Sequence, residues 1–190
     1  MHHSRPETPD TLGADLRALR KTRGLTLSQM AEQLGRSVGW LSQVERNKSE
    51  PSIADLREIA SCLDVSVSML FRHAAAPAHE AGFIVRNNSR RPIGSTIAGL
   101  VEELLSPDLT DDFEMVHSTF QPHSRIEQAV CRPTQEVGYL IEGSMIIEIE
   151  GTPHVLNPGD SFRIRGESFR WSNPNPVPAV AIWVIAPPIY

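Results

Sequence analysis

Hydrophobic residues in the first third of the chain recur at the three- and four-residue spacing of amphipathic helices. This pattern predicts helices over 14–23, 26–34, 37–45 and 52–63, and a short fifth helix from 66 to 71. Residues suited to capping stand at the expected boundaries, namely Thr26, Ser37 and Ser52 before helices and Gly24 and Gly35 after them. The expected core positions are Leu12, Leu16, Leu19, Leu27, Met30, Ala31, Leu34, Val38, Leu41, Val44, Ile53, Leu56, Ile59, Ala60 and Leu63.

From residue 82 onward the hydrophobic period changes to two, which is typical of strands. The segment MIIEIEG is the clearest case, because Ile147 and Ile149 alternate with Glu148 and Glu150. Many short strands separated by Pro, Gly, Asn and Asp predict a β-sandwich or barrel of about 110 residues. The sequence therefore predicts a tail at 1–11, a helical domain at 12–72, a linker at 73–81 and a β domain at 82–190.

The charge distribution separates the two halves. The 190 residues carry a formal net charge of -5, yet residues 17–48 hold seven basic and two acidic side chains, a local charge of +5. Residues 73–190 hold eight basic and fourteen acidic side chains, a local charge of -6. Local charge governs an encounter with phosphates more than total charge does. The helical half is thus the candidate for nucleic-acid binding.

Apolar runs and cysteine spacing indicate the cellular compartment in which the protein works. No apolar run is long enough to span a bilayer, and the N-terminus has no apolar stretch of the kind found in secretory signals. Cys62 and Cys131 are far apart and have no CxxC partner, so a disulfide framework is not expected. We therefore expect a cytoplasmic protein that does not contact membranes.

The helical segment resembles the Xre-type, lambda-repressor-like DNA-binding domain. The residues that carry this resemblance are LR..R...GLTLSQMAEQLG.S.GWLSQVER....PSI..L..IA..L.VS...LF, which span nearly all of 12–71. The resemblance implies a five-helix domain that binds a double-stranded DNA operator, with the helices at 26–34 and 37–45 as the DNA-reading pair. It also implies that Arg20 and Glu45 form a structural ion pair.

Exposed residues of this pair of helices are the candidate DNA contacts. The helix at 37–45 would present to the bases Ser37, Val38, Gly39, Trp40, Ser42 and Gln43. Gln43 can bond adenine through two hydrogen bonds. Trp40 has two interpretations of equal weight, either lying against the sugar-phosphate backbone or packing on the preceding helix. Phosphate contacts are expected from Thr26, Ser28, Gln29, Arg36, Asn47 and Lys48.

The β-rich half resembles a cupin, a double-stranded β-barrel, through EVGYLIEGSMIIEIEGTPHVLNPGDSFRIRGESFRWSNPNPVPAVAIWVIAPP. Cupin enzymes usually hold a metal through H-x-H-x-x-x-E and a later histidine four residues before an asparagine. Alignment on Glu136 places Val130 and Arg132 at the first two histidine positions, and alignment on Asn173 places Phe169 at the third. A single carboxylate is a poor site for a transition metal. We therefore expect no metal and no other cofactor.

Without a metal site, the mouth of the predicted barrel is a candidate binding site for a small organic molecule. The candidate lining residues are Arg132, Glu136, Tyr139, Met145, Phe162, Phe169, Trp171 and Trp183. Arg132 and Glu136 either hold a ligand bearing both charge signs, such as an amino acid, or neutralise each other as an ion pair. We expect Phe169 and Trp171 on opposite faces of their strand, with one of them at an interface.

The joint pattern resembles a bacterial regulator group that includes the putrescine-utilisation repressor. It implies a homodimeric transcriptional regulator, most simply a repressor, whose cupin domain senses a small-molecule effector. Two alternatives stay open. One is a cupin-fold isomerase or oxygenase with an appended helical domain, and the other is a protein-interaction module.

Overall fold

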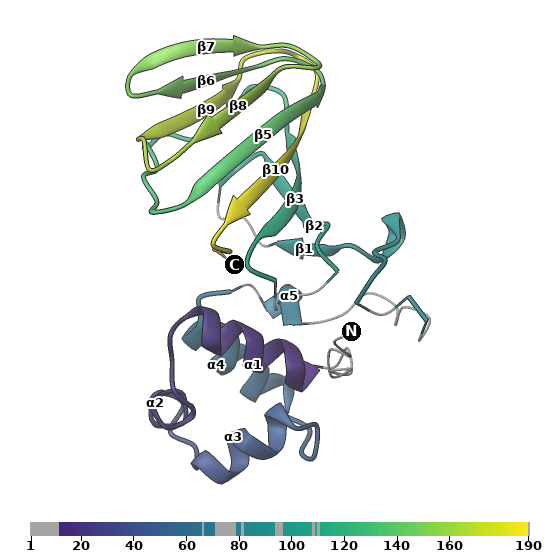
Figure 1. Cartoon of the computed structure of the whole chain (residues 1–190), viewed down its shortest axis with the longest axis vertical. Coiled ribbons are helices and arrows are strands. Elements are labelled where there is room, and N and C mark those ends of the chain that lie inside the picture. The colour runs from purple at the N-terminus through teal and green to yellow at the C-terminus, as the bar shows by residue number, and fades with distance from the viewer. Residues whose placement is uncertain are drawn as a thin grey trace, which may run out of the picture. The chain divides into compact units, whose positions relative to one another are not determined.

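The computed structural model describes residues 12–65, 67–70, 79–80, 82–93, 97–107, 109 and 111–189. The chain divides into two compact units (Figure 1). The helical unit falls within 1–89 together with 107–110, and the strand unit within 90–106 and 111–190. The expected tail at 1–11 lies outside the described residues, as does nearly all of the expected linker at 73–81.

Within its described residues, the helical unit contains four α-helices of seven residues or more, one single-turn α-helix and a 3-10 helix at Asn87–Ser89. The α-helices are α1 (Leu12–Thr22), α2 (Leu27–Gln33), α3 (Val38–Glu45), α4 (Ile53–Leu63) and α5 (Val67–Leu70). The prediction of five helices is thus right for the first four, whereas the fifth is only four residues long. Its expected first and last residues, 66 and 71, lie outside the described residues.

The helical core follows the predicted stripes, except that Leu12, Leu27 and Leu34 are half-buried and two further positions are exposed. Leu16, Leu41, Ile59 and Leu63 are fully buried, but Val38 is 43% exposed and Ile53 is 63% exposed. Both exposed positions are the first residue of their helix. A residue in the first turn can lie beyond the neighbouring helix even when its spacing matches the stripe, and this explains the wrong burial predictions.

The described residues of the strand unit form ten antiparallel strands in two open sheets (Figure 1). The six-stranded sheet has the order β1-β2-β3-β10-β5-β8 and the other the order β4-β9-β6-β7. The bounds are β1 (Arg91–Ile93), β2 (Leu100–Leu104), β3 (Glu114–Phe120), β4 (Ser124–Arg125), β5 (Gln135–Glu142), β6 (Met145–Ile149), β7 (Thr152–Leu156), β8 (Ser161–Ile164), β9 (Phe169–Asn173) and β10 (Ala179–Ala186). The expected closed barrel is therefore corrected to a cupin-like β-sandwich.

The barrel is open because the edge strands, β1 and β8 in one sheet and β4 and β7 in the other, share no ladder within the described residues. The chain crosses between the sheets from β9 to β10 through the sequence PNPVP, whose prolines lack a backbone N–H and favour a corner over a continued strand. Asn173 holds this corner, since its Nδ2 donates to the carbonyls of Phe120 (3.0 Å) and Val177 (2.8 Å).

The two sheets enclose one hydrophobic core. Strict alternation along β3, β5 and β10 buries every second residue, and Leu140, Ala181 and Trp183 face inward. Phe162 and Trp183 meet edge to face with ring centroids 4.7 Å apart, as do Phe120 and Trp171. None of the helices within the described ranges is long and apolar enough to cross a membrane.

Candidate nucleic-acid interface and effector site

Local capping builds the turn between α2 and α3. Thr26 and Gln29 form a capping box, in which the Gln29 N–H donates to Thr26 Oγ1 (3.2 Å) and the Thr26 N–H donates to Gln29 Oε1 (2.9 Å). Ser37 caps α3 by accepting from the Trp40 N–H at 3.1 Å. Gly35 supplies the positive φ of 61° that turns the chain out of α2. Each predicted cap at this motif is present.

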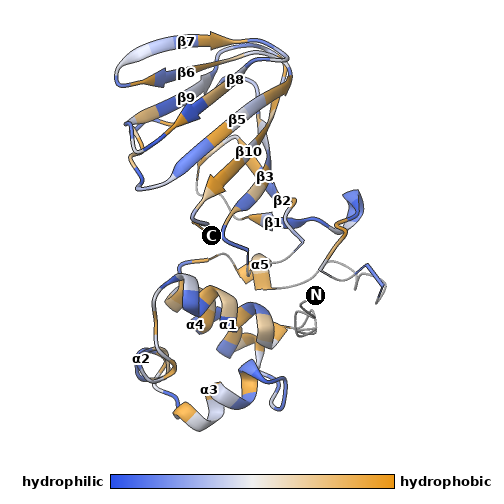
Figure 2. Ribbon diagram, viewed as in Figure 1, coloured by the Kyte–Doolittle hydropathy of each residue, from blue (hydrophilic) through white to orange (hydrophobic). Residues whose placement is uncertain are grey.

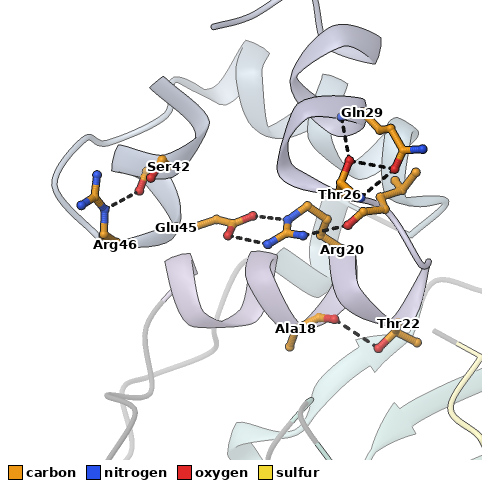
Figure 3. Close-up of polar contacts among 9 residues, drawn as sticks. Ala18, Arg20, Thr22, Thr26, Gln29, Ser42, Glu45 and Arg46 are labelled. Carbon is orange, nitrogen blue, oxygen red and sulfur yellow. Dashed lines mark hydrogen bonds and ion pairs between the residues drawn. The ribbon is translucent and has the colours of Figure 1, made fainter. Parts of the chain in front are cut away.

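A buried ion pair fixes the two helices against α1 (Figure 3). Arg20 donates from Nε to Glu45 Oε1 (2.6 Å) and from Nη2 to Glu45 Oε2 (3.0 Å). Its third donor, Nη1, reaches the Leu25 carbonyl at 2.7 Å, just before α2. The hydrogen bonds to Glu45 raise the pKa of Arg20. One guanidinium therefore ties α1, α3 and the entry to α2 together.

A second contact brings α1 close to the end of α3. A Cβ on Gly13 would lie 2.5 Å from the Val44 carbonyl oxygen, so only glycine permits this approach. Asn47, at φ 55°, accepts from the Gly13 N–H through Oδ1 at 3.0 Å. The sequence predicts a phosphate contact for Asn47 and no role for Gly13. The bond across 34 residues has no local signal in the sequence.

Ten of the twelve predicted DNA contacts are exposed, and Trp40 and Ser42 are half-buried. The exposed ones are Thr26, Ser28, Gln29, Arg36, Ser37, Val38, Gly39, Gln43, Asn47 and Lys48. Arg46 was missed by the sequence analysis. It is also exposed, and its Nε donates to the Ser42 carbonyl at 3.0 Å.

The Trp40 ring lies against the Arg36 guanidinium, a contact that neither interpretation of Trp40 anticipated. The Arg36 guanidinium carbon lies 5.2 Å from the Trp40 ring centroid, and the same side chain forms an ion pair with Asp55 at the start of α4. Hydrogen bonds from Ser52, followed by the Arg36 charge, lower the pKa of Asp55. Arg36 thus braces the turn between α2 and α3 besides adding positive charge to it.

In the strand unit, the residues aligned with cupin metal ligands come together. Val130 bridges Phe169, the Arg132 guanidinium carbon lies 5.5 Å from the Phe169 ring centroid, and Arg132 Nε lies 3.2 Å from Glu136 Oε1. The alignment therefore places these positions correctly in space. Valine and phenylalanine offer no donor, and arginine is a cation, so this set does not fit a metal. Throughout the described residues, no three His, Cys, Asp or Glu side chains gather as metal ligands would.

Three carboxylates lie on the inner side of the six-stranded sheet beside this set, and two of them were missed. Glu136 is fully buried and accepts from Thr134 Oγ1 at 2.7 Å. Glu114 is 1% exposed, and burial raises its pKa to about 7 although the Ile189 N–H donates to it at 3.1 Å. Burial also raises the pKa of Glu102, which accepts from Ser118 Oγ at 3.3 Å.

Two expectations for the pocket lining are corrected. Tyr139 is 50% exposed, because it is three residues from the inward Glu136 on β5 and so faces the other way. Phe169 and Trp171 are both buried, because residues two apart share a strand face. Trp183 and Met145 are core residues, while Phe162 packs partly buried against that core over Gly138.

Two of the surface hollows formed by described residues of the strand unit are relevant to the predicted lining. The first, of about 270 Å³, lies over β6 and β9 and includes Trp171 of the predicted lining, beside Arg170 and Glu148. The second, of about 500 Å³, lies beside Thr134, Arg165 and Pro187. The interior cluster at Arg132 and Glu136 lines neither of these two hollows.

Each half of the chain matches a known domain family. Residues 11–70 match the helix-turn-helix domain family and residues 116–185 match the cupin domain family. The HTH-type transcriptional regulator PuuR of Escherichia coli (strain K12) is 25% identical over 155 residues, covering 80% of this chain and 81% of PuuR. The E. coli regulator SutR is 46% identical over 57 residues, 30% of this chain and 32% of SutR.

Among solved structures, an HTH_3 family transcriptional regulator from Vibrio cholerae is 26% identical in sequence, with a TM-score of 0.44. The match covers 94% of this chain and 96% of the Vibrio cholerae chain. PuuR matches across both halves of the chain, whereas SutR matches over 57 residues only. The chain joins a DNA-binding helix-turn-helix domain to a C-terminal cupin domain and is homologous to the HTH-type transcriptional regulators.

Proposed function

We propose that α3 enters the major groove of an operator and reads its bases, and that the cupin half senses a small metabolite. The observation that carries the first part is the exposed side of α3. It presents Ser37, Gly39 and Gln43 to solvent while Leu41, Val44 and Glu45 anchor the helix from behind. A short helix held this rigidly can place its side chains at base edges without first paying to become ordered.

Gln43 and Lys48 have different parts in this proposal. The Gln43 amide can donate to and accept from adenine, and it therefore contributes to sequence specificity. Lys48 lies beyond the end of α3, where its charge can meet a phosphate and contributes the same binding energy at any sequence. Positive charge along residues 17–48 supports a steep dependence of binding on salt.

Alanine substitutions separate these parts. On an operator selected in vitro, Gln43→Ala should relax preference at one base position by about tenfold or more, corresponding to about 1–3 kcal/mol. Lys48→Ala should weaken binding to all sequences and lower the salt slope by about one. Arg57→Ala, which removes an exposed charge from α4, is the matched control and should change neither quantity. Gel-shift titrations measure all three, and unchanged operator affinity in both test variants would refute the docking.

The proposal of an effector rests on the inner carboxylates. Glu114 is buried and Glu102 is half-buried, desolvation raises the pKa of both, and Arg132 is paired with Glu136. A small molecule with an ammonium group, such as an amino acid, would supply the missing positive charge. Thermal shift with a panel of L-amino acids tests this, and a true effector must also change operator affinity, since only a ligand with unequal affinity for two states shifts them.

Repression is the simplest outcome to propose. A protein bound over a promoter blocks polymerase without needing a surface that recruits it. Transcription in vitro from a promoter containing the selected operator should fall as protein is added. A rise in transcript would assign activation instead, and the docking of α3 would stand.

A further inference from the structure

The exposed residues of α3 differ sharply in chemistry. They are Val38, Gly39 and Gln43, and Val38 is 43% exposed although its side chain is apolar. Hydrophobic and hydrophilic residues both occur along this helix (Figure 2). Under the proposed function Gln43 has a base to read, whereas valine has no hydrogen bond to offer. The exposure of Val38 therefore needs a different kind of contact.

The composition of α3 favours A·T pairs over G·C pairs. Its sequence, VGWLSQVE, contains neither arginine nor lysine, the side chains that most often bond guanine O6 and N7. In the major groove thymine presents a C5-methyl group, which apolar side chains contact. Among the groups on the base edges, this methyl is the one that Val38 matches.

The first turn of α3 leaves room for such a contact. Side chains four residues apart share a row on a helix, so Gly39 stands in the row of Gln43, next to Val38. A Cβ on Gly39 would have only Ser37 Oγ within 4 Å, at 3.9 Å. A base edge can therefore approach the helix beside Val38. Valine in a helix has one strongly preferred χ1 rotamer, so it loses little freedom when it packs.

Trp40 is the other large apolar side chain of α3 that is not fully buried. It is half-buried, and the Arg36 guanidinium carbon lies 5.2 Å from its ring centroid. Part of the indole surface is thus already in contact within the protein. Val38 has more of its surface free for a base.

Charges at the two ends of α3 indicate that the occupant is a nucleic acid. Arg36 precedes the helix, Arg46 and Lys48 follow it, and all three are exposed. The one acidic side chain of α3, Glu45, is buried and forms an ion pair with Arg20 at 2.6 Å. An apolar group between exposed positive charges is complementary to a thymine methyl between phosphates.

We propose that Val38 reads the C5-methyl group of a thymine in the major groove. The inference rests on the proposed function, because it assigns a base to a second residue of α3. Val38 and Gln43 are five residues apart, about 7.5 Å along the helix axis. Base pairs are stacked about 3.4 Å apart, so the two residues meet different base pairs.

Thymine-to-uracil replacement tests this contact in the full chain. Each thymine of an operator selected in vitro is replaced in turn by uracil, which lacks only the methyl group. At one thymine, uracil should weaken binding about fourfold, as expected for one methyl group removed from an apolar contact. At the same position 5-methylcytosine should bind about fourfold more tightly than cytosine. Fluorescence anisotropy titrations measure all four affinities.

Alanine variants assign the effect to a residue. Val38→Ala should lower the thymine-to-uracil affinity ratio from about four to about one. Ile53→Ala is the matched control, because Ile53 is also the first residue of its helix after a serine cap and is 63% exposed. It should keep the ratio at about four, as should Gln43→Ala, which acts at another base pair. Far-ultraviolet circular dichroism checks that the variants are folded.

The possible outcomes separate this inference from the proposed function. A sequence-specific complex in which no thymine methyl affects affinity would overturn the role of Val38 and leave the docking of α3 intact. The same conclusion follows if the uracil effect persists in Val38→Ala or is lost equally in Ile53→Ala. Absence of any sequence-specific binding would overturn the proposed function, and the inference with it.

Discussion

Glu114 shows how strongly the interior of the strand unit acts on a single residue. Its side chain is 1% exposed, and burial raises its pKa to about 7. The negative charges of Glu102 and Glu136 raise the pKa of Glu114 further, whereas the hydrogen bond from the Ile189 N–H and the positive charge of Arg132 lower it. The folded protein therefore binds a proton at Glu114 that the unfolded chain releases near pH 4.5.

This raised pKa predicts a loss of stability with rising pH. The contribution of protonated Glu114 is complete below pH 4.5, decreases as the unfolded chain ionises, and is gone once pH passes about 7. The loss amounts to at most about 3 kcal/mol. Glu114→Gln keeps the shape without the titration, so its stability should be flatter between pH 4.5 and 7. Urea unfolding of both proteins across that window measures this, and parallel curves would show that Glu114 is not responsible.

At the scale of elements, the helix-turn-helix depends on how closely α1 crosses α3. Gly13 allows that approach, and Arg20 and Glu45 join the same helices in a buried pair. Removing one partner of such a pair leaves a charge buried without compensation, which costs far more than breaking a surface pair. The α3 helix is thus positioned mainly by contacts on the side away from its exposed face.

Two glycine substitutions test this crossing. Gly13→Ala should destabilise the helical unit by about 1–3 kcal/mol, since its Cβ would meet the backbone of Val44 and Glu45. Gly39→Ala on α3 is the matched control, because its Cβ has only Ser37 Oγ within 4 Å, at 3.9 Å. It should stabilise the helix by up to about 1 kcal/mol. Urea unfolding followed by circular dichroism measures both, and equal effects would show that the close crossing is not limiting.

The elements that sequence could predict are those specified by nearby residues. Caps such as Thr26 and Ser37 act over three residues, and the core positions Leu16 and Leu41 follow from helical spacing, so both were predicted correctly. The bond from Gly13 to Asn47 and the gathering of Glu102 and Glu114 near Arg132 depend on the folded topology. No local pattern specifies such contacts, nor whether a sheet closes.

The alternation of buried and exposed residues also specifies which face of a strand a residue occupies. The prediction that Tyr139 lines the pocket beside Glu136 was wrong because the two residues are three positions apart on a regular strand. Glu136 and Tyr139 are three apart and lie on opposite faces, whereas Phe169 and Trp171 are two apart and share one. The alternation on β5 was sufficient to place Val137, Tyr139 and Ile141 together.

At the scale of the whole molecule, the two units differ in charge. The helical segment 17–48 carries a charge of +5 and the half from 73 to 190 carries -6, so under the proposed function nucleic acid would be attracted to the helical segment. A homodimer, as the family resemblance implies, would present two α3 helices. Its operator would then be palindromic, with half-sites separated by about one turn of DNA, or ~34 Å.

Methylation protection on a selected operator tests the central claim that α3 reads the major groove. Dimethyl sulfate reports guanine N7 in the major groove and adenine N3 in the minor groove. The bound protein should protect guanine N7 in two patches about one helical turn apart, and Gln43→Ala should reduce protection beside its base. Protection confined to adenine N3, or no protection of guanine N7 at saturating protein, would contradict the placement of α3.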